Sequence, residues 1–181
     1  MTDTQGTLSG PAPRWPGVIG TIGIILGVIM FIDKADDLFV LRLMRSQETW
    51  RQFVGTELAK FIVDAMPARF WMLSSSLIGL ALAVLLVVGS SRLVRRRQSG
   101  ITLCKTWSWL AIAWVLIEIA QVSWWFNVYG SRIPGVAGTA WRAPTISVLI
   151  VVFLVMLAYP IFQLLWFSRG DVREQIQLWP P

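Results

Sequence analysis

The sequence predicts an all-α integral membrane protein with four transmembrane helices and an amphipathic interfacial segment between the first two. Composition is the first observation: hydrophobic residues make up 55% of the chain and charged residues 14%, with a mean hydropathy of +0.63. Soluble domains contain roughly 45–50% apolar and about 25% charged residues. The second observation is that four apolar runs alternate with polar connections. Their lengths suit a hydrocarbon core of about 30 Å, although the first run is short for it.

The first span is predicted over residues 16–32, with Trp15 at the membrane interface. Residues 1–14 are expected to be a disordered tail ahead of a transmembrane domain over residues 15–168. Small residues that let membrane helices approach closely lie along one side of this span. They are Gly20, Gly23 and Gly27. This face packs either within the chain or against a second copy.

Residues 36–66 are too charged to span a membrane, yet their apolar residues recur close to the 3.6-residue period. We predict one or two amphipathic helices on the membrane surface or capping the bundle; a solvated linker is the alternative. Carboxylates at i, i+3 and i+4 near the start of this segment have a spacing that can hold a hard cation. They are Asp33, Asp36 and Asp37. We expect a solvated helix start there and no metal.

The second span is predicted over residues 70–89, with Trp71 at the interface. Small residues for helix packing recur in it every fourth position: Ser75, Gly79 and Ala83. The short turn that follows carries the densest positive charge of any connection: Arg92, Arg95, Arg96 and Arg97. The positive-inside rule therefore predicts that this turn and both termini are cytoplasmic, with residues 33–69 and 130–142 outside.

The third span is predicted over residues 106–129, with interface tryptophans at both ends: Trp107, Trp109, Trp124 and Trp125. Glu118 lies near the expected bilayer midplane, with Gln121 on the same helical face. Because an unpaired carboxylate in hydrocarbon is costly, we expect Glu118 to face the bundle interior or a partner helix. Its expected hydrogen-bond donors are Gln121, an indole such as that of Trp114, or the serines 74–76 of the second span.

The fourth span is predicted over residues 145–168. Pro160 is expected to kink it, because proline lacks the amide proton for the bond to the carbonyl one turn back. Gln163 lies beside the freed carbonyl and is a further intramembrane polar candidate; a plain packing kink is the alternative. Residues 169–181 are expected to form a polar cytoplasmic tail.

Three stretches resemble a group of known proteins. They are residues 14–20 (R-W-P-G-V-I-G), the arginine-rich turn over 87–100, and the terminal stretch over 159–179. Their layout resembles small four-span bacterial membrane proteins without an assigned function. The resemblance implies a bacterial inner membrane and a four-helix fold, and it supplies no catalytic residue.

The residue inventory limits the function classes. The chain contains no histidine and a single cysteine, Cys104, so histidine-ligated haem or zinc, histidine-based catalysis and an intramolecular disulfide are excluded. Membrane retention explains the arginine-rich turn, so the net charge of +6 does not indicate nucleic acid. We expect no cofactor and no enzymatic activity, because the chain carries no recognisable catalytic motif.

The leading hypothesis is a membrane subunit or scaffold whose partners are the lipid bilayer and either other membrane protein subunits or further copies of itself. The alternative is a small oligomeric transporter or channel that uses Glu118. A lipid enzyme built from the Asp33–Asp37 cluster and the arginine-rich turn is disfavoured, because the predicted topology places the two on opposite faces of the membrane.

Overall fold

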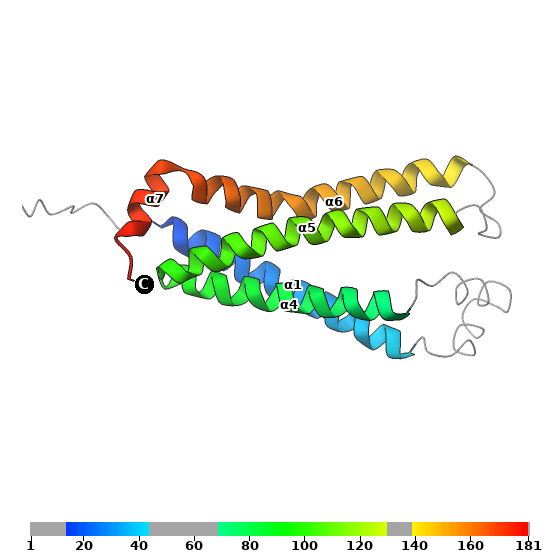
Figure 1. Cartoon of the computed structure of the whole chain (residues 1–181), viewed down its shortest axis with the longest axis horizontal. Helices are drawn as coiled ribbons and strands as arrows, with labels where there is room; N and C mark the ends of the chain where they lie inside the picture. The colour runs from blue at the N-terminus through cyan, green and yellow to red at the C-terminus, as the bar shows by residue number, and fades with distance from the viewer. Residues whose placement is uncertain (1–13, 44–68, 130–138, 181) are drawn as a thin grey trace, which may run out of the picture.

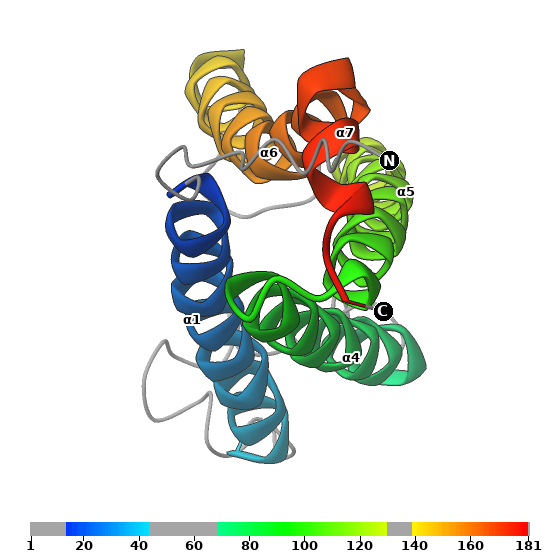
Figure 2. The same ribbon diagram turned by 90° about the vertical axis from the view of Figure 1, so that its left-hand side faces the viewer.

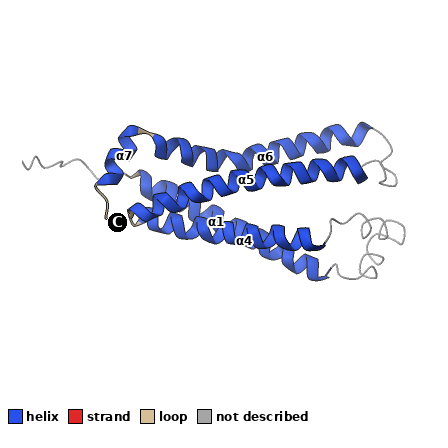
Figure 3. Ribbon diagram, in the orientation of Figure 1, coloured by secondary structure: helices blue, strands red, loops and turns tan. Residues whose placement is uncertain are grey.

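The computed structural model describes residues 14–43, 69–129 and 139–180. This described part is helical, apart from short turns (Figure 3). Its helices follow the order α1 (Trp15–Leu43), α4 (Arg69–Val94), α5 (Gln98–Tyr129), α6 (Thr139–Ser168) and α7 (Gly170–Gln177) (Figure 1). The first four contain candidate membrane spans over Trp15–Phe39, Trp71–Val94, Gln98–Trp124 and Ile150–Ser168. The predicted all-α class with four spans is confirmed, and the chain is a multi-pass membrane protein.

Neighbouring long helices contact one another in the order α1, α4, α5 and α6. In Figure 1 they lie as two pairs, α1 beside α4 and α5 beside α6. The four helices converge at the end of the bundle where α7 lies, and we call this the closed end. Toward the opposite end, the α1–α4 pair diverges from the α5–α6 pair (Figures 1 and 2). We call that end the open end.

Helix α1 is much longer than the predicted span over residues 16–32. It continues through the aspartate cluster to Leu43, so residues 36–43 of the predicted amphipathic segment belong to α1. Lys34 pairs with Asp33 at 3.1 Å and with Asp37 at 2.8 Å. These pairs neutralise charge along the helix and help it to continue toward the surface. The rest of that segment lies outside the described residues, as does the tail over residues 1–13.

The turn between α4 and α5 is tighter than predicted, because α5 begins at Gln98 instead of near residue 106. The α4 end forms a Schellman motif, in which Arg97 N donates to Arg92 O at 3.0 Å and Arg96 N donates to Leu93 O at 2.9 Å. Arg96 takes the left-handed conformation that this motif requires, with φ of 54°. Gly100 then lets α5 approach closely, since a Cβ there would lie 2.5 Å from Leu93 N.

The glycine face of α1 packs against α4, which is the within-chain alternative of the two considered above. A Cβ on Gly20 would lie 2.5 Å from Val94 Cγ2 and 2.9 Å from the Ser90 carbonyl oxygen. One on Gly27 would lie 2.6 Å from a Val87 methyl and 3.2 Å from the carbonyl oxygen of the fully buried Ala83. Because glycine has no side chain at these positions, the backbones of the two helices can approach each other closely.

Helix α6 packs on the rest of the chain mainly near the closed end. It starts earlier than predicted, at Thr139, and runs unbroken through the buried Pro160. In its middle the side chains of Val151, Leu154 and Val155 are exposed by 60%, 62% and 68%. In its last turns Gln163 and Phe167 are completely buried. The interior of the bundle is therefore built toward the closed end.

We predict that Gly20→Ala destabilises the protein by about 1–3 kcal/mol, because the new methyl meets α4 backbone that cannot move without separating the helices. Gly17→Ala is the matched control, since nothing lies within 4 Å of a Cβ at Gly17. Thermal or denaturant unfolding in detergent measures both variants. Equal stability of the two would contradict the glycine-mediated packing of α1 on α4.

Candidate functional site

The open end carries a hydrogen-bonded carboxylate between α4 and α5. Ser75 Oγ of α4 donates to Glu118 Oε1 of α5 at 3.0 Å, so one of the serines expected as donors is the partner. The ring of Trp71 stacks on that of Trp114, with centroids 6.2 Å apart and an interplanar angle of 11°. Glu118 and Gln121, one turn later, remain half-buried. We call Ser75 and Glu118 the open-end polar pair.

The depth of Glu118 differs from the expectation of a midplane position. Because α5 begins at Gln98, the candidate span Gln98–Trp124 is centred near Ala111. Glu118 lies seven residues beyond that centre, or about 10 Å at the helical rise. The penalty for a charged group falls toward the membrane surface, so hydrogen bonding at this depth can accommodate the carboxylate.

Lys34 of α1 lies at a depth similar to that of Glu118, because it too is about 10 Å beyond the centre of its own span. Its stem crosses Gly79 of α4, where a Cβ would lie 2.8 Å from the lysine Cγ and Cδ. Its ammonium pairs with Asp33 and Asp37, so two members of the aspartate cluster are engaged in ion pairs. No group of three metal-binding side chains occurs in the described ranges.

A second polar region lies inside the bundle near the closed end. Gln163 Oε1 of α6 accepts from Ser108 Oγ of α5 at 2.9 Å, and the same hydroxyl lies 2.9 Å from Cys104 O. Tyr159 Oη donates to Ile19 O of α1 at 3.0 Å, which joins α6 directly to α1. Within the described part, Ser90 Oγ and Gln163 Nε2 are buried without a hydrogen-bond partner. Side chains or backbone from α1, α4, α5 and α6 therefore meet here.

Buried apolar side chains also pack between α4 and α5 in the middle of the bundle. They are Leu82, Leu86, Trp107 and Ala111. Trp107 is only 3% exposed, so it is a core residue and not the interface anchor that the sequence predicts. The reason is again the early start of α5, which places Trp107 two and a half turns inside the helix.

The closed end is covered by the C-terminal segment, where a polar tail is expected from sequence. Trp15 Nε1 donates to Gln175 Oε1 at 2.8 Å, and its ring stacks on Trp179 at 5.4 Å. Gln98 Nε2 donates to Trp179 O at 2.8 Å, and Gln98 N donates to Pro180 O at 3.1 Å. Trp15 is thus a half-buried part of this closure and not a simple lipid anchor.

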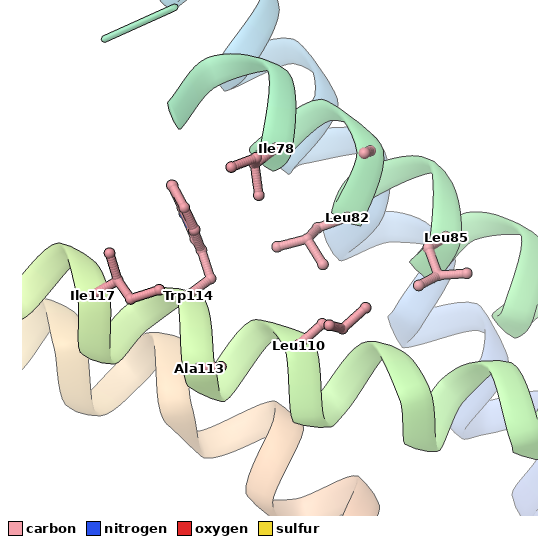
Figure 4. A pocket seen from close by; sticks show the side chains of 8 residues that line it. Ile78, Leu82, Leu85, Leu110, Ala113, Trp114 and Ile117 are labelled. Atoms are coloured by element: carbon pink, nitrogen blue, oxygen red, sulfur yellow. The ribbon is translucent and has the colours of Figure 1, made fainter. Parts of the chain in front are cut away.

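The outward surface of the spans is apolar. Trp109 and Trp124 are exposed by 66% and 56%, as lipid-facing residues would be, while the Trp125 side chain lies outside the described set. A shallow groove of about 320 Å³ runs between α4 and α5, where Ile78 and Leu82 face Leu110, Trp114 and Ile117 (Figure 4). Its apolar lining suits hydrocarbon chains.

Sequence reasoning missed α7 and its contacts, although a signal is present. Val172, Ile176 and Trp179 follow i, i+4, i+7 spacing, which is typical of one helical face. Val172 and Trp179 are 2% and 8% exposed in the closed-end core, with Ile176 packed against them. The polar residues between them conceal this short pattern.

We predict that Trp179→Ala raises the maleimide labelling rate of Cys104 by roughly tenfold or more. Cys104 is completely buried in the same core cluster as Trp179, and truncating a buried Trp costs about 3–5 kcal/mol of packing. Leu178→Ala is the matched control, because Leu178 is 75% exposed. Labelling kinetics of the full-length protein in detergent are compared. If the two variants label at the same rate, α7 does not cover this end.

Comparisons with known proteins supply no functional assignment, so the function has to be argued from the geometry of the sites. No protein family, curated protein or solved structure matches this chain.

Proposed function

We propose that this chain is a non-enzymatic subunit or scaffold of a larger membrane assembly, and that its open end packs against a partner helix. The observation that carries the proposal is the half-buried Glu118 carboxylate. Among the described residues, Ser75 supplies a hydrogen bond to it, whereas a carboxylate accepts about four. Lipid hydrocarbon offers no donor, so a helix from a partner protein or a second copy is the natural cover.

The shape of the open end supports the same proposal. The α1–α4 and α5–α6 pairs diverge there (Figure 1), and the middle of α6 is exposed at Val151, Val152, Leu154 and Val155. Lipid alone can cover such apolar faces, so they do not require a partner. They nevertheless offer an apolar surface on which another helix can pack.

The alternative is a transporter or channel that uses Glu118. The buried apolar residues Leu82 and Ala111 lie along α4 and α5 between the open-end polar pair and the buried Ser108–Gln163 pair. A pathway would therefore have to run between copies of the chain. This makes transport the second candidate.

For cellular placement we propose a bacterial inner membrane, from the resemblance to small four-span bacterial proteins, with the closed end in the cytoplasm. The arginine-rich turn and Trp15 contact the C-terminal segment that includes α7, so all lie at the closed end, which the positive-inside rule assigns to the cytoplasmic face. The aspartate cluster of α1 then lies toward the outer face.

The test is purification of the full-length chain from its native membrane in mild detergent, with the stoichiometry of co-purifying chains quantified. We expect a stoichiometric partner with the wild type and with Glu118→Gln, whose amide still hydrogen-bonds. Glu118→Leu should weaken the association roughly 3- to 30-fold, as loss of one intramembrane hydrogen bond of about 0.6–2 kcal/mol implies.

Leu116→Ala is the control, because Leu116 is 55% exposed on the opposite face of α5. Monomeric wild-type protein, without a partner even after crosslinking in the membrane, would contradict the proposal. Transport activity that Glu118→Gln abolishes without disturbing the fold would instead establish the alternative.

A further inference from the structure

Every candidate span is followed or preceded by an arginine at the closed end. Arg14 precedes Trp15, Arg95 follows Val94, Arg97 precedes Gln98 and Arg169 follows Ser168. Arg92 and Arg173 lie within one turn of these positions. All six side chains are exposed. We call them the arginine rim: Arg14, Arg92, Arg95, Arg97, Arg169 and Arg173.

The fold brings two distant segments together to make this rim. The Schellman motif fixes the backbone that carries Arg95 and Arg97. The next residue, Gln98, bonds the C-terminal segment through its side chain to Trp179 O at 2.8 Å and through its backbone to Pro180 O at 3.1 Å. Arg173 on α7 is thereby held at the same end of the bundle as the turn.

The described part of the protein neutralises little of the rim's charge. Asp171 and Glu174 are the carboxylates on α7, and Arg169 contacts Asp171 at 3.6 Å and the Trp166 ring at 5.1 Å. The other five arginines of the rim form no ion pair with any residue of ranges 14–43, 69–129 and 139–180. At the open end, by contrast, Lys34 is paired with aspartates.

We propose that the arginine rim binds the phosphate groups of anionic phospholipids in the leaflet that surrounds the closed end. Guanidinium groups form forked, charge-assisted hydrogen bonds with phosphate oxygens. The rim begins where each apolar span ends, which is the depth of lipid headgroups. Leu178, 75% exposed beside the rim, adds an apolar side chain suited to the same interface. This placement favours lipid over a soluble acidic protein.

The test uses the full-length protein in mixed vesicles of phosphatidylglycerol and phosphatidylcholine, with spin-labelled forms of each lipid. The ratio of their association constants with the protein is measured at low and high salt. We expect the wild type to prefer phosphatidylglycerol, and the preference to weaken with salt because the contact is electrostatic. The triple variant Arg92→Gln/Arg95→Gln/Arg97→Gln should have a weaker preference for phosphatidylglycerol, by up to about fivefold for each arginine removed.

Two further variants test whether both segments contribute and whether charge is the cause. Arg169→Gln/Arg173→Gln should also reduce the preference, whereas Arg92→Lys/Arg95→Lys/Arg97→Lys should retain most of it. Protection of Cys104 from maleimide reports that each variant keeps its closed end.

Folded glutamine variants with wild-type lipid preference would overturn the proposal, as would lysine variants that lose as much as the glutamine variants. If only the turn arginines affect the preference, the composite rim is wrong. If the glutamine variants keep the lipid preference but lose a bound acidic protein, the rim recognises that protein and the lipid proposal fails.

Discussion

The close approach of α1 to α4 at Gly23 is the contact on which the closed end depends. A Cβ on Gly23 would collide with the Ser90 hydroxyl and lie 2.7 Å from Tyr159 Oη. Because Gly23 has no side chain, hydroxyl groups from α4 and α6 occupy that space together. Tyr159 can then reach the Ile19 carbonyl and join the first helix to the last long one. Further contacts between α1 and the C-terminal helices lie nearer the end of the bundle, where Trp15 packs on Trp166, Phe167 and Trp179.

This arrangement divides the bundle into regions with different roles. The closed end contains the buried Ser108–Gln163 pair and the covering α7, so its polar groups are used mainly in holding helices together. The open end leaves a hydrogen-bonded carboxylate only half-buried. We therefore expect partner proteins to bind at the open end, and contacts at the closed end to supply most of the stability of the fold.

The fold class and the glycine face could be predicted from sequence, because apolar length and small-residue spacing are local properties. Helix ends were harder to predict. Lys34 pairs with neighbouring aspartates and allows α1 to continue, and the Schellman motif uses Arg96 where glycine is usual. Neither the ion pairs of Lys34 nor an arginine in a Schellman motif can be recognised from a local sequence pattern. The resulting shift in α5 moved Trp107 into the core and Glu118 away from the midplane.

The candidate site could also be predicted only in part, because its contacts depend on how the helices cross and not on local sequence. Glu118 is conspicuous as a carboxylate in an apolar run, and a donor in the second span follows from the need to satisfy it. Ser75 as the particular donor depends on the crossing of α4 and α5, which no local pattern specifies. The closure by Gln98, Trp15 and Trp179 joins residues from three distant parts of the chain.

The most direct test of this account is the separation of α1 and α6 at the two ends of the bundle. Spin-label pairs can be placed on exposed positions in a Cys104→Ser background, at Val18 with Leu165 near the closed end and at Phe31 with Val151 toward the open end. Pulsed electron paramagnetic resonance in lipid bilayers should give a clearly longer distance for the second pair. Equal distances would mean parallel helices and would contradict a bundle that is closed at one end and open at the other.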